Sequence, residues 1–304
     1  MSGRTEDYRY DHYKGRRLNK RGRRKKRARG CLRTVASMLV IVISFICVKN
    51  IVFDNLLNPD SSFSIDTGAL AEMFGGDGST ESQLKRMARS NDTVRQILEQ
   101  PDLYPEELLE MLAGNEEAAQ FVLDYPENKD NTPADSIGDV TKGEIPLLLQ
   151  WDERWGYGAY GNSMIAISGC GPTVVAMVSA GLLGDSSITP YKVAQYAQDH
   201  GYYVEGTGTS WSLMTEGARQ FGVQGQELGL SESSIVSELE NGHPIICSMR
   251  PGDFTTSGHF IVLTGVENGK IRVNDPNSKV NSEKLWDYDR LESQINNLWA
   301  FSVA

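Results

Sequence analysis

The sequence has few cysteines and histidines, and neither residue type is arranged as a metal site. The 304 residues include four cysteines, with no Cys-x-x-Cys pair. The four histidines, His12, His200, His243 and His259, are scattered along the chain. A structural zinc site needs a cluster of such ligands, so we expect no metal, and we expect no other cofactor. Only two of the cysteines, Cys170 and Cys247, lie beyond residue 53, so one disulfide is possible but a disulfide framework is not.

Two further absences narrow the class of protein. The sequence has no G-x-x-x-x-G-K-[ST] loop, which argues against an ATPase. Its 30 glycines follow no three-residue period, and 39% of its residues are hydrophobic. A collagen-like or wholly disordered chain is therefore excluded, and the length is enough for one or two domains.

Charge is unevenly distributed along the chain. Residues 1–33 hold 14 basic and three acidic side chains, a net charge of +11, whereas the other 271 residues carry −21. The basic segment lacks the interleaved aromatic residues and reading motifs of nucleic-acid-binding regions. We therefore expect it to contact anionic lipid, not nucleic acid.

One long apolar run follows this basic segment. Residues 35–48 carry no charge, and Lys49 is the single charged residue between residues 34 and 53. About 20 apolar residues suffice for a helix to cross a bilayer. The charge asymmetry predicts an uncleaved signal anchor at 34–53, with residues 1–33 as a cytoplasmic tail and residues 54–304 outside the cell membrane. A cleaved signal peptide is the alternative, because the uncharged core is short.

Residues 54–144 are predicted to form a linker and a helical stalk. Apolar residues recur at helical spacing between residues 82 and 126, and this pattern predicts three short helices. Pro105 begins the second helix, and Asn115 can cap the third. These helices form either a stalk or a small lobe that rests on the following domain. Residues 127–143 have the composition of a linker.

Residues 145–304 contain the features that indicate chemistry. Cys170 precedes a run of apolar residues at helical spacing that ends at Gly184, so it lies in the first turn of a buried helix. The positive end of a helix favours thiolate over thiol. Gly169 and Gly171 on either side leave room for a substrate backbone. We predict that Cys170 is a nucleophile; the alternative is a small buried core cysteine.

The remaining segments predict helices first and strands later. Helices are expected at about 189–200, 210–221 and 231–241, followed by strand-like runs at 244–249, 259–265, 270–274 and 298–303. This order is typical of an α+β domain.

A thiol nucleophile needs a base, and His259 is the best-placed histidine. His259 begins one predicted strand and Asp275 ends the next, so both lie at one end of a hairpin. A strict two-residue turn at Asn268–Gly269 would put Asn274 on the His259 face. A three-residue turn or a bulge would put Asp275 there instead. The sequence leaves this register open, and His259 could also be a structural histidine.

Four short motifs occur in an order that resembles a known family. They are Gln150–Trp155, Ser168–Thr173, Gly258–Val262 and Val273–Pro276. Together they resemble the papain-like cysteine peptidases. Within these, the chain is most similar to domains related to the peptidases that cleave double-glycine leaders from bacteriocin precursors. The resemblance covers residues 145–304.

The resemblance implies a fold and a set of site residues. The fold is an α+β one, in which the catalytic-cysteine helix and a helical lobe pack on an antiparallel sheet. Cys170 is implied as nucleophile, His259 as general base and Asp275 as its orienting partner. Gln150 is implied as an oxyanion donor beside the backbone N–H of Cys170. Leader peptidases place this glutamine a few residues before the cysteine, whereas Gln150 lies twenty residues upstream and could instead be a polar residue opening the loop. The helices at 82–126 resemble the companion segment of membrane-anchored bacterial members.

The expected function is therefore a membrane-anchored extracellular cysteine peptidase acting on a peptide or protein. One alternative is a cell-wall peptide amidase or endopeptidase with the same three residues, although no wall-binding repeat is visible. Another is a non-catalytic papain-like binding module. The sequence has no ATPase motif and only one apolar span, which excludes a full peptidase-containing transporter. The sequence does not indicate an oligomeric state.

Overall fold

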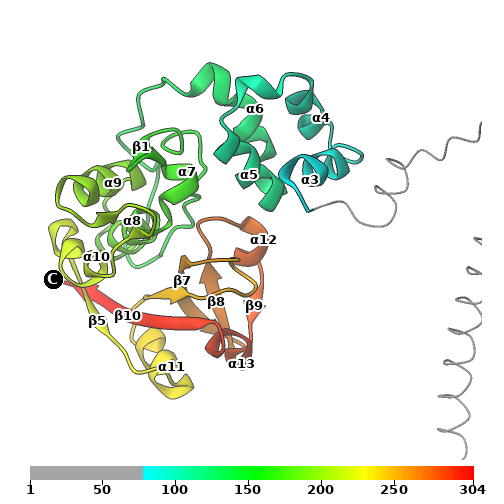
Figure 1. The fold of residues 1–304 in the computed structure, drawn as a ribbon. Coiled ribbons are helices and arrows are strands. Elements are labelled where there is room, and N and C mark those ends of the chain that lie inside the picture. Colours follow the sequence, from blue (N-terminus) through cyan, green and yellow to red (C-terminus); the bar gives the residue numbers. More distant parts are fainter. Residues whose placement is uncertain (1–77) are drawn as a thin grey trace, which may run out of the picture. The chain divides into compact units, whose positions relative to one another are not determined.

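The computed structural model describes residues 78–304 (Figure 1). The predicted basic tail at 1–33, the predicted anchor at 34–53 and the start of the predicted linker lie outside the described residues. Among the helices of residues 78–304, none has both the length and the apolar character that a bilayer crossing requires.

Four α-helices and two short 3-10 helices form the first part of the described chain, which we call the helical lobe (residues 78–128; Figure 1). They are α3 (Thr80–Met87), α4 (Asp92–Glu99), η1 (Pro101–Leu103), α5 (Glu106–Gly114), η2 (Glu116–Ala118) and α6 (Ala119–Asn128). The prediction of three helices was wrong by one. The Asn91 side chain accepts the N–H groups of Thr93 and Val94, so it caps a new helix within the first predicted stretch. The last helix also continues through Pro126.

The helical lobe shares a hydrophobic cluster with the domain that follows it. Leu149, Trp151, Met164 and Ala166 are buried in one cluster with apolar side chains from the lobe helices. The Phe121 ring of α6 also stacks on Tyr157, with 4.2 Å between the ring centroids. Of the two predicted alternatives, these contacts are those of a lobe resting on the domain and not of an isolated stalk.

The predicted linker at 127–143 is bound to the domain along much of its length. Ile137 is only 6% exposed and belongs to the main hydrophobic cluster of the domain. The backbone N–H groups of Ala134, Ile137 and Gly143 donate to the carbonyl oxygens of Arg154, Ser186 and Gly181. Residues 134–143 of the predicted linker contain no helix or strand, but these contacts attach them to the domain.

A six-stranded antiparallel sheet forms the centre of the domain, in the order β5-β10-β6-β7-β8-β9 (Figure 1). Its strands are β5 (Val223–Glu227), β6 (Ile245–Met249), β7 (His259–Glu267), β8 (Lys270–Asn274), β9 (Leu285–Trp286) and β10 (Ile295–Val303). The four predicted strands are confirmed as β6, β7, β8 and β10. The two missed strands lie at the sheet edges, where β5 is mostly polar and β9 is only two residues long.

Two small hairpins and eight helical segments complete the domain. The hairpins are β1 (Ala159–Tyr160) with β2 (Ser163–Met164), and β3 (Tyr203–Val204) with β4 (Gly208–Thr209). The helices are α7 (Ile165–Ser168), α8 (Cys170–Leu183), α9 (Pro190–Asp199), α10 (Ser212–Thr215), η3 (Gly217–Phe221), α11 (Glu232–Glu240), α12 (Lys279–Ser282) and α13 (Tyr288–Glu292). The single helix predicted at 210–221 is thus two short segments, α10 and η3.

Helices cover both faces of the sheet. Helix α8 packs its apolar residues against one face, in a cluster that includes Ile246, Val262 and Trp299. Helices α11 and α13 cover the other face, in a cluster that includes Cys247 and Ile261. Strands β6 and β7 contribute to both clusters because successive side chains of a strand point to opposite faces. The predicted mixture of helices with an antiparallel sheet is confirmed.

The shared cluster predicts that the helical lobe and the domain unfold together. Phe121→Ala should lower the free energy of unfolding by about 3 kcal/mol, because it deletes a buried ring at the contact between them. All five tryptophans lie after residue 145, and only Trp151 is buried in the cluster shared with the lobe, so in a Trp151→Phe background their fluorescence during denaturation reports on the domain. We expect their transition to move to lower denaturant. Gln120→Ala, on the exposed side of the same helix, should change it by less than about 0.5 kcal/mol. An unchanged tryptophan transition in Phe121→Ala would show that the lobe unfolds separately.

Candidate active site

Cys170 is the first residue of α8 and is half-buried at one wall of a pocket of about 650 Å³. Helix α8 is apolar on all sides and its residues from Gly171 to Gly181 are buried, so the helix is fixed in the core. The backbone N–H groups of a first helical turn have no partner within the helix. Cys170 therefore combines a rigid position with nearby N–H dipoles, as the sequence predicted.

The two glycines beside Cys170 serve the packing of the protein itself. A Cβ added to Gly171 would lie 2.5 Å from Thr209 Oγ1, and one added to Gly169 would lie 2.6 Å from Ile165 Cγ2. Both distances are too short for real side chains. The prediction that these glycines leave room for a substrate backbone is corrected, because neighbouring side chains occupy that space.

His259 lines the same pocket as Cys170 and is held by Asp275. The distance between His259 Nε2 and Asp275 Oδ1 is 2.8 Å, and the two residues are only 8% and 1% exposed. Because Nε2 is engaged, Nδ1 is the ring nitrogen left for Cys170. Burial lowers the pKa of His259, but the hydrogen bond to Asp275 and the nearby Cys170 outweigh it and raise the pKa to about 10. The imidazole therefore favours its charged form.

A β-bulge brings Asp275 to the His259 side of the hairpin. The turn is the two-residue Asn268–Gly269 turn, with positive φ at both residues. The pairing register then shifts at Thr264, so one extra residue is inserted in β7. The structure thus selects the bulge among the registers that the sequence left open. Asn274 points elsewhere, and its Nδ2 donates to the Ile145 carbonyl oxygen at 3.1 Å.

The loop after β8 fixes the Asp275 carboxylate. Oδ1 accepts the backbone N–H of Asn277 at 2.8 Å, and Oδ2 accepts Asn281 Nδ2 at 3.0 Å. The backbone N–H of Asp275 donates to Ser282 Oγ at 2.9 Å. With both oxygens held, the carboxylate can present only one geometry to His259.

Gln150 is buried but is not among the residues that line the pocket of Cys170 and His259. Its Nε2 donates to the carbonyl oxygen of Ala166 at 2.6 Å, and its backbone N–H donates to the Pro276 carbonyl oxygen at 2.8 Å. Its amide thus bonds to the turn that leads to Cys170. The role of Gln150 as an oxyanion donor stays a prediction, as does the alternative of a polar loop residue.

The other cysteine and histidines of the described residues lie away from this pocket. Cys247 is fully buried in β6, and burial raises the pKa of its thiol, so we expect it to be unreactive. Both cysteines are free. His200 Nδ1 contacts the Tyr196 carbonyl oxygen at 2.9 Å, and His243 pairs with Glu238 at 2.7 Å.

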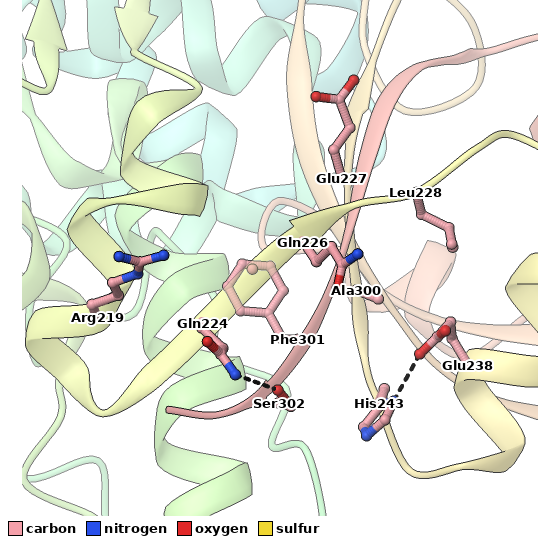
Figure 2. Close-up of a pocket in the computed structure, with 11 residues that line it drawn as sticks. Arg219, Gln224, Gln226, Glu227, Leu228, Glu238, His243, Ala300, Phe301 and Ser302 are labelled. Atoms are coloured by element: carbon pink, nitrogen blue, oxygen red, sulfur yellow. Dashed lines mark hydrogen bonds and ion pairs between the residues drawn. The ribbon is translucent and has the colours of Figure 1, made fainter.

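His243 lies at a second hollow, of about 600 Å³, between β5, β10 and the end of α11 (Figure 2). Figure 2 shows the His243–Glu238 pair on one side and the hydrogen bond from Gln224 to Ser302 on the other. Neither Cys170 nor His259 lines this hollow. In residues 78–304, no group of three or more His, Cys, Asp or Glu side chains is placed to hold a metal ion.

Sequence reasoning missed most of the pocket walls. The pocket is also lined by the β3–β4 hairpin, by Trp211 and by Arg250, whose Nη2 donates to Asn296 Oδ1 at 2.9 Å. Gly206-Thr-Gly208 is a turn signal that could have indicated the hairpin. No local signal joins Arg250 to Asn296, because they meet only through the pairing of β6 with β10.

Three solved structures are similar to part of this chain. The first is the peptidase domain of Streptococcus ComA, a bifunctional ABC transporter involved in quorum sensing. It is 22% identical, covers 45% of this chain and 91% of its own, and has a TM-score of 0.35. The second is a double-glycine-motif protease from an AMS/PCAT transporter in complex with its leader peptide. It is 16% identical, covers 55% of this chain and 98% of its own, and has a TM-score of 0.35. The third is described as a C39-like peptidase from Bacillus anthracis. It is 14% identical, covers 55% of this chain and 98% of its own, and has a TM-score of 0.33.

A search of curated proteins gives no match. The model of the Peptidase_C39 like family, by contrast, matches residues 142–302, more than half of the chain. The matched residues include α8 with Cys170 and the β7–β8 hairpin with His259 and Asp275. The chain therefore belongs to the Peptidase_C39 like family.

Proposed function

We propose that the chain is a cysteine peptidase that hydrolyses peptide bonds with Cys170, His259 and Asp275. One observation carries the proposal. Cys170 at the start of α8 and His259 line one pocket, and His259 is held from behind by a buried carboxylate. This is the arrangement of nucleophile, base and orienting group that thiol catalysis needs. Family membership supports a cysteine peptidase but does not by itself assign these roles.

Before a substrate is attacked, the Cys170 thiol has already given its proton to His259 Nδ1, which leaves a thiolate beside the charged imidazole. In the first half of the reaction, this thiolate attacks the carbonyl carbon of a peptide bond. The negative charge that develops on the carbonyl oxygen is stabilised by backbone N–H groups at the start of α8. The C–N bond then breaks, and the protonated His259 supplies the proton that the leaving amine needs.

In the second half, water hydrolyses the acyl-enzyme. His259, now neutral, removes a proton from the water as its oxygen attacks the thioester carbon. The C–S bond breaks, the acid product leaves, and the thiolate of Cys170 is restored beside the protonated His259. Asp275 stays bound to Nε2 throughout, so it fixes the ring and stabilises each imidazolium that forms.

The proposed nucleophile predicts selective labelling. Cys170 should react with a thiol-directed peptide electrophile, whereas Cys247, which is buried, should react at least about a hundredfold more slowly. Peptide-level mass spectrometry of the full chain measures both sites. Cys170→Ala should abolish labelling and peptide hydrolysis together. Equal, slow labelling of the two cysteines would contradict the proposal. Labelling of Cys170 without hydrolysis of any peptide would indicate the non-catalytic binding module, and hydrolysis of wall peptides alone would indicate the amidase alternative.

The pairing of His259 with Asp275 predicts how kcat/KM depends on pH. The pKa of His259 is raised, so its charged form should persist above neutral pH and be lost as the pH rises through about 10. The contribution of this charge to the stability of the folded state is complete below the pKa of about 6.5 that the group has in the unfolded chain. It is lost as the pH rises through about 10. Asp275→Asn should lower the pKa of His259, so the alkaline fall of kcat/KM should move to lower pH.

Two comparisons check that result. His259→Ala should lower kcat/KM by about a hundred- to ten-thousandfold, because the proton transfer itself is lost. Asn274→Ala should leave the alkaline limb in place, since Asn274 bonds to Ile145 and not to His259. If Asn274→Ala moves the limb and Asp275→Asn does not, the assignment of the orienting residue is wrong.

We further propose that the peptidase domain faces outward from a single membrane span. The sequence supports this topology through the basic residues 1–33 and the apolar residues 34–53, as argued above. Protease added to intact cells that express the full chain should then remove the folded domain and spare the N-terminal segment. Digestion that needs membrane permeabilisation would reverse the orientation. A soluble product that begins after residue 48 would show a cleaved signal peptide instead.

A further inference from the structure

The helical lobe contacts the loop that holds Asp275. Glu117, in η2, lies against the start of α12, which follows Asp275 in the sequence. Its Oε1 accepts the hydroxyl of Ser278, and its Oε2 accepts the backbone N–H groups of Lys279 at 2.8 Å and Val280 at 3.3 Å. Three donors of one short segment therefore converge on a single carboxylate from another part of the fold.

Asn115 makes a second contact from the lobe to the same loop. Its Nδ2 donates to the carbonyl oxygen of Asn277 at 2.7 Å and to the side-chain oxygen of Asn277 at 3.1 Å. Its Oδ1 accepts the backbone N–H of Glu117 at 3.1 Å, so the two lobe residues also orient each other. Trp151 Nε1 donates to the same Asn277 carbonyl oxygen at 3.0 Å. The backbone at Asn277 is thus held from two sides.

The segment held by the lobe, residues 277–280, includes one residue that bonds to the Asp275 carboxylate and leads directly into two others that fix Asp275. Asn277 donates its backbone N–H to Oδ1, the oxygen that faces His259. Asn281, in α12, donates to Oδ2, and Ser282 accepts the backbone N–H of Asp275. A continuous chain of hydrogen bonds therefore runs from the lobe, through this loop, to the ring of His259.

We infer that Glu117, with Asn115, is a positioning residue that sets the orientation of Asp275 toward His259 from the helical lobe. This inference rests on the proposed function, because it assigns the lobe a part in that same site. Residues 145–304 alone then lack part of the site, since Asn115 and Glu117, which hold the loop next to Asp275, come before them in the sequence.

Several carboxylates lie close to Asp275, so a substitution at one of them changes charge as well as hydrogen bonds. Glu116, Glu117, Asp253 and Asp275 line one hollow of about 300 Å³ between the lobe and the domain. Removing any of these carboxylates changes the electrostatic potential at Asp275 as well as the contacts. Two cations lie nearby: Lys279, with its Nζ 5.2 Å from the centre of the Trp151 ring, and Arg290, which pairs with Asp253.

The chain offers matched variants that separate contact from charge. Glu117→Ala removes the contact and a charge, and Asn115→Ala removes a contact without changing charge. Glu116→Ala removes a neighbouring charge, but the contact of Glu116 is with Asn91, within the lobe. Glu117→Gln keeps one oxygen that can accept the Lys279 N–H, so it should restore part of what Glu117→Ala loses.

The readout is the rate at which Cys170 is alkylated by iodoacetamide at about pH 7 in the full chain, measured by peptide mass spectrometry. We expect Glu117→Ala and Asn115→Ala to slow this alkylation roughly three- to tenfold. Asp275→Asn should slow it more, and adding Glu117→Ala to Asp275→Asn should change little, because both act through one group. Where peptide hydrolysis is measured, kcat should fall and KM should stay close to wild type. Tryptophan fluorescence under assay conditions confirms that each variant remains folded.

The outcomes distinguish this inference from the function it rests on. If wild-type Cys170 is alkylated as slowly as Cys247, the proposed nucleophile is wrong and the positioning role falls with it. If Cys170 reacts fast and depends on His259 and Asp275, but Glu117→Ala matches Glu116→Ala, only the positioning role is overturned. Additive effects of Glu117→Ala and Asp275→Asn would also overturn it, because they would show that Glu117 acts by another route.

Discussion

The buried hydrogen bond between His259 and Asp275 is the contact on which the rest of the site depends. Burial alone disfavours a charged imidazole, so the ring can stay protonated only next to an aligned carboxylate. That carboxylate is itself 1% exposed, and an unpaired charge at such a depth would cost several kcal/mol. The fold therefore has to supply hydrogen bonds to Asp275 before His259 can act as a base. The loop after β8 supplies them through Asn277 and Asn281.

The two sides of the site rest on one packed cluster. Ala166, four residues before Cys170, is buried among the apolar side chains of the helical lobe, and Trp151 of the same cluster bonds to Asn277 beyond Asp275. The segment that leads to the nucleophile and the loop that orients the base therefore share their support. This explains why a lobe outside the region matched by the family model contacts the loop that holds Asp275.

The sequence predicted the elements whose burial follows a simple period. Helix α8 and strands β6, β7, β8 and β10 are regular apolar segments, so their existence and the order of their residues could be predicted. The bulge at Thr264 could not be predicted from the sequence. One inserted residue changes which face of the sheet each later side chain points to, but it leaves the apolar runs that identify the two strands recognisable. The sequence accordingly left Asn274 and Asp275 as alternatives.

Predictions that depended on distant contacts were less successful. The polar edge strand β5 has no apolar alternation to mark it, and it is defined by its pairing with β10. The bond from the Gln150 amide to Ala166 could not be predicted either, because it is set by how two loops fold together. Glu117 looks in the sequence like an ordinary charged residue at the start of a helix. Its contact with the loop 278–280 exists only in the folded chain.

The protonation state of the His259 ring shows directly whether the buried Asp275 carboxylate keeps it charged. The ¹⁵N chemical shifts of its ring, measured in the full chain at about pH 8, report each nitrogen separately. We expect both nitrogens to carry protons at this pH, with Nε2 in a strong hydrogen bond, and Asp275→Asn to make the ring neutral. A wild-type ring that is already neutral at about pH 8 and titrates near its ordinary pKa of about 6.5 would contradict this role of the carboxylate.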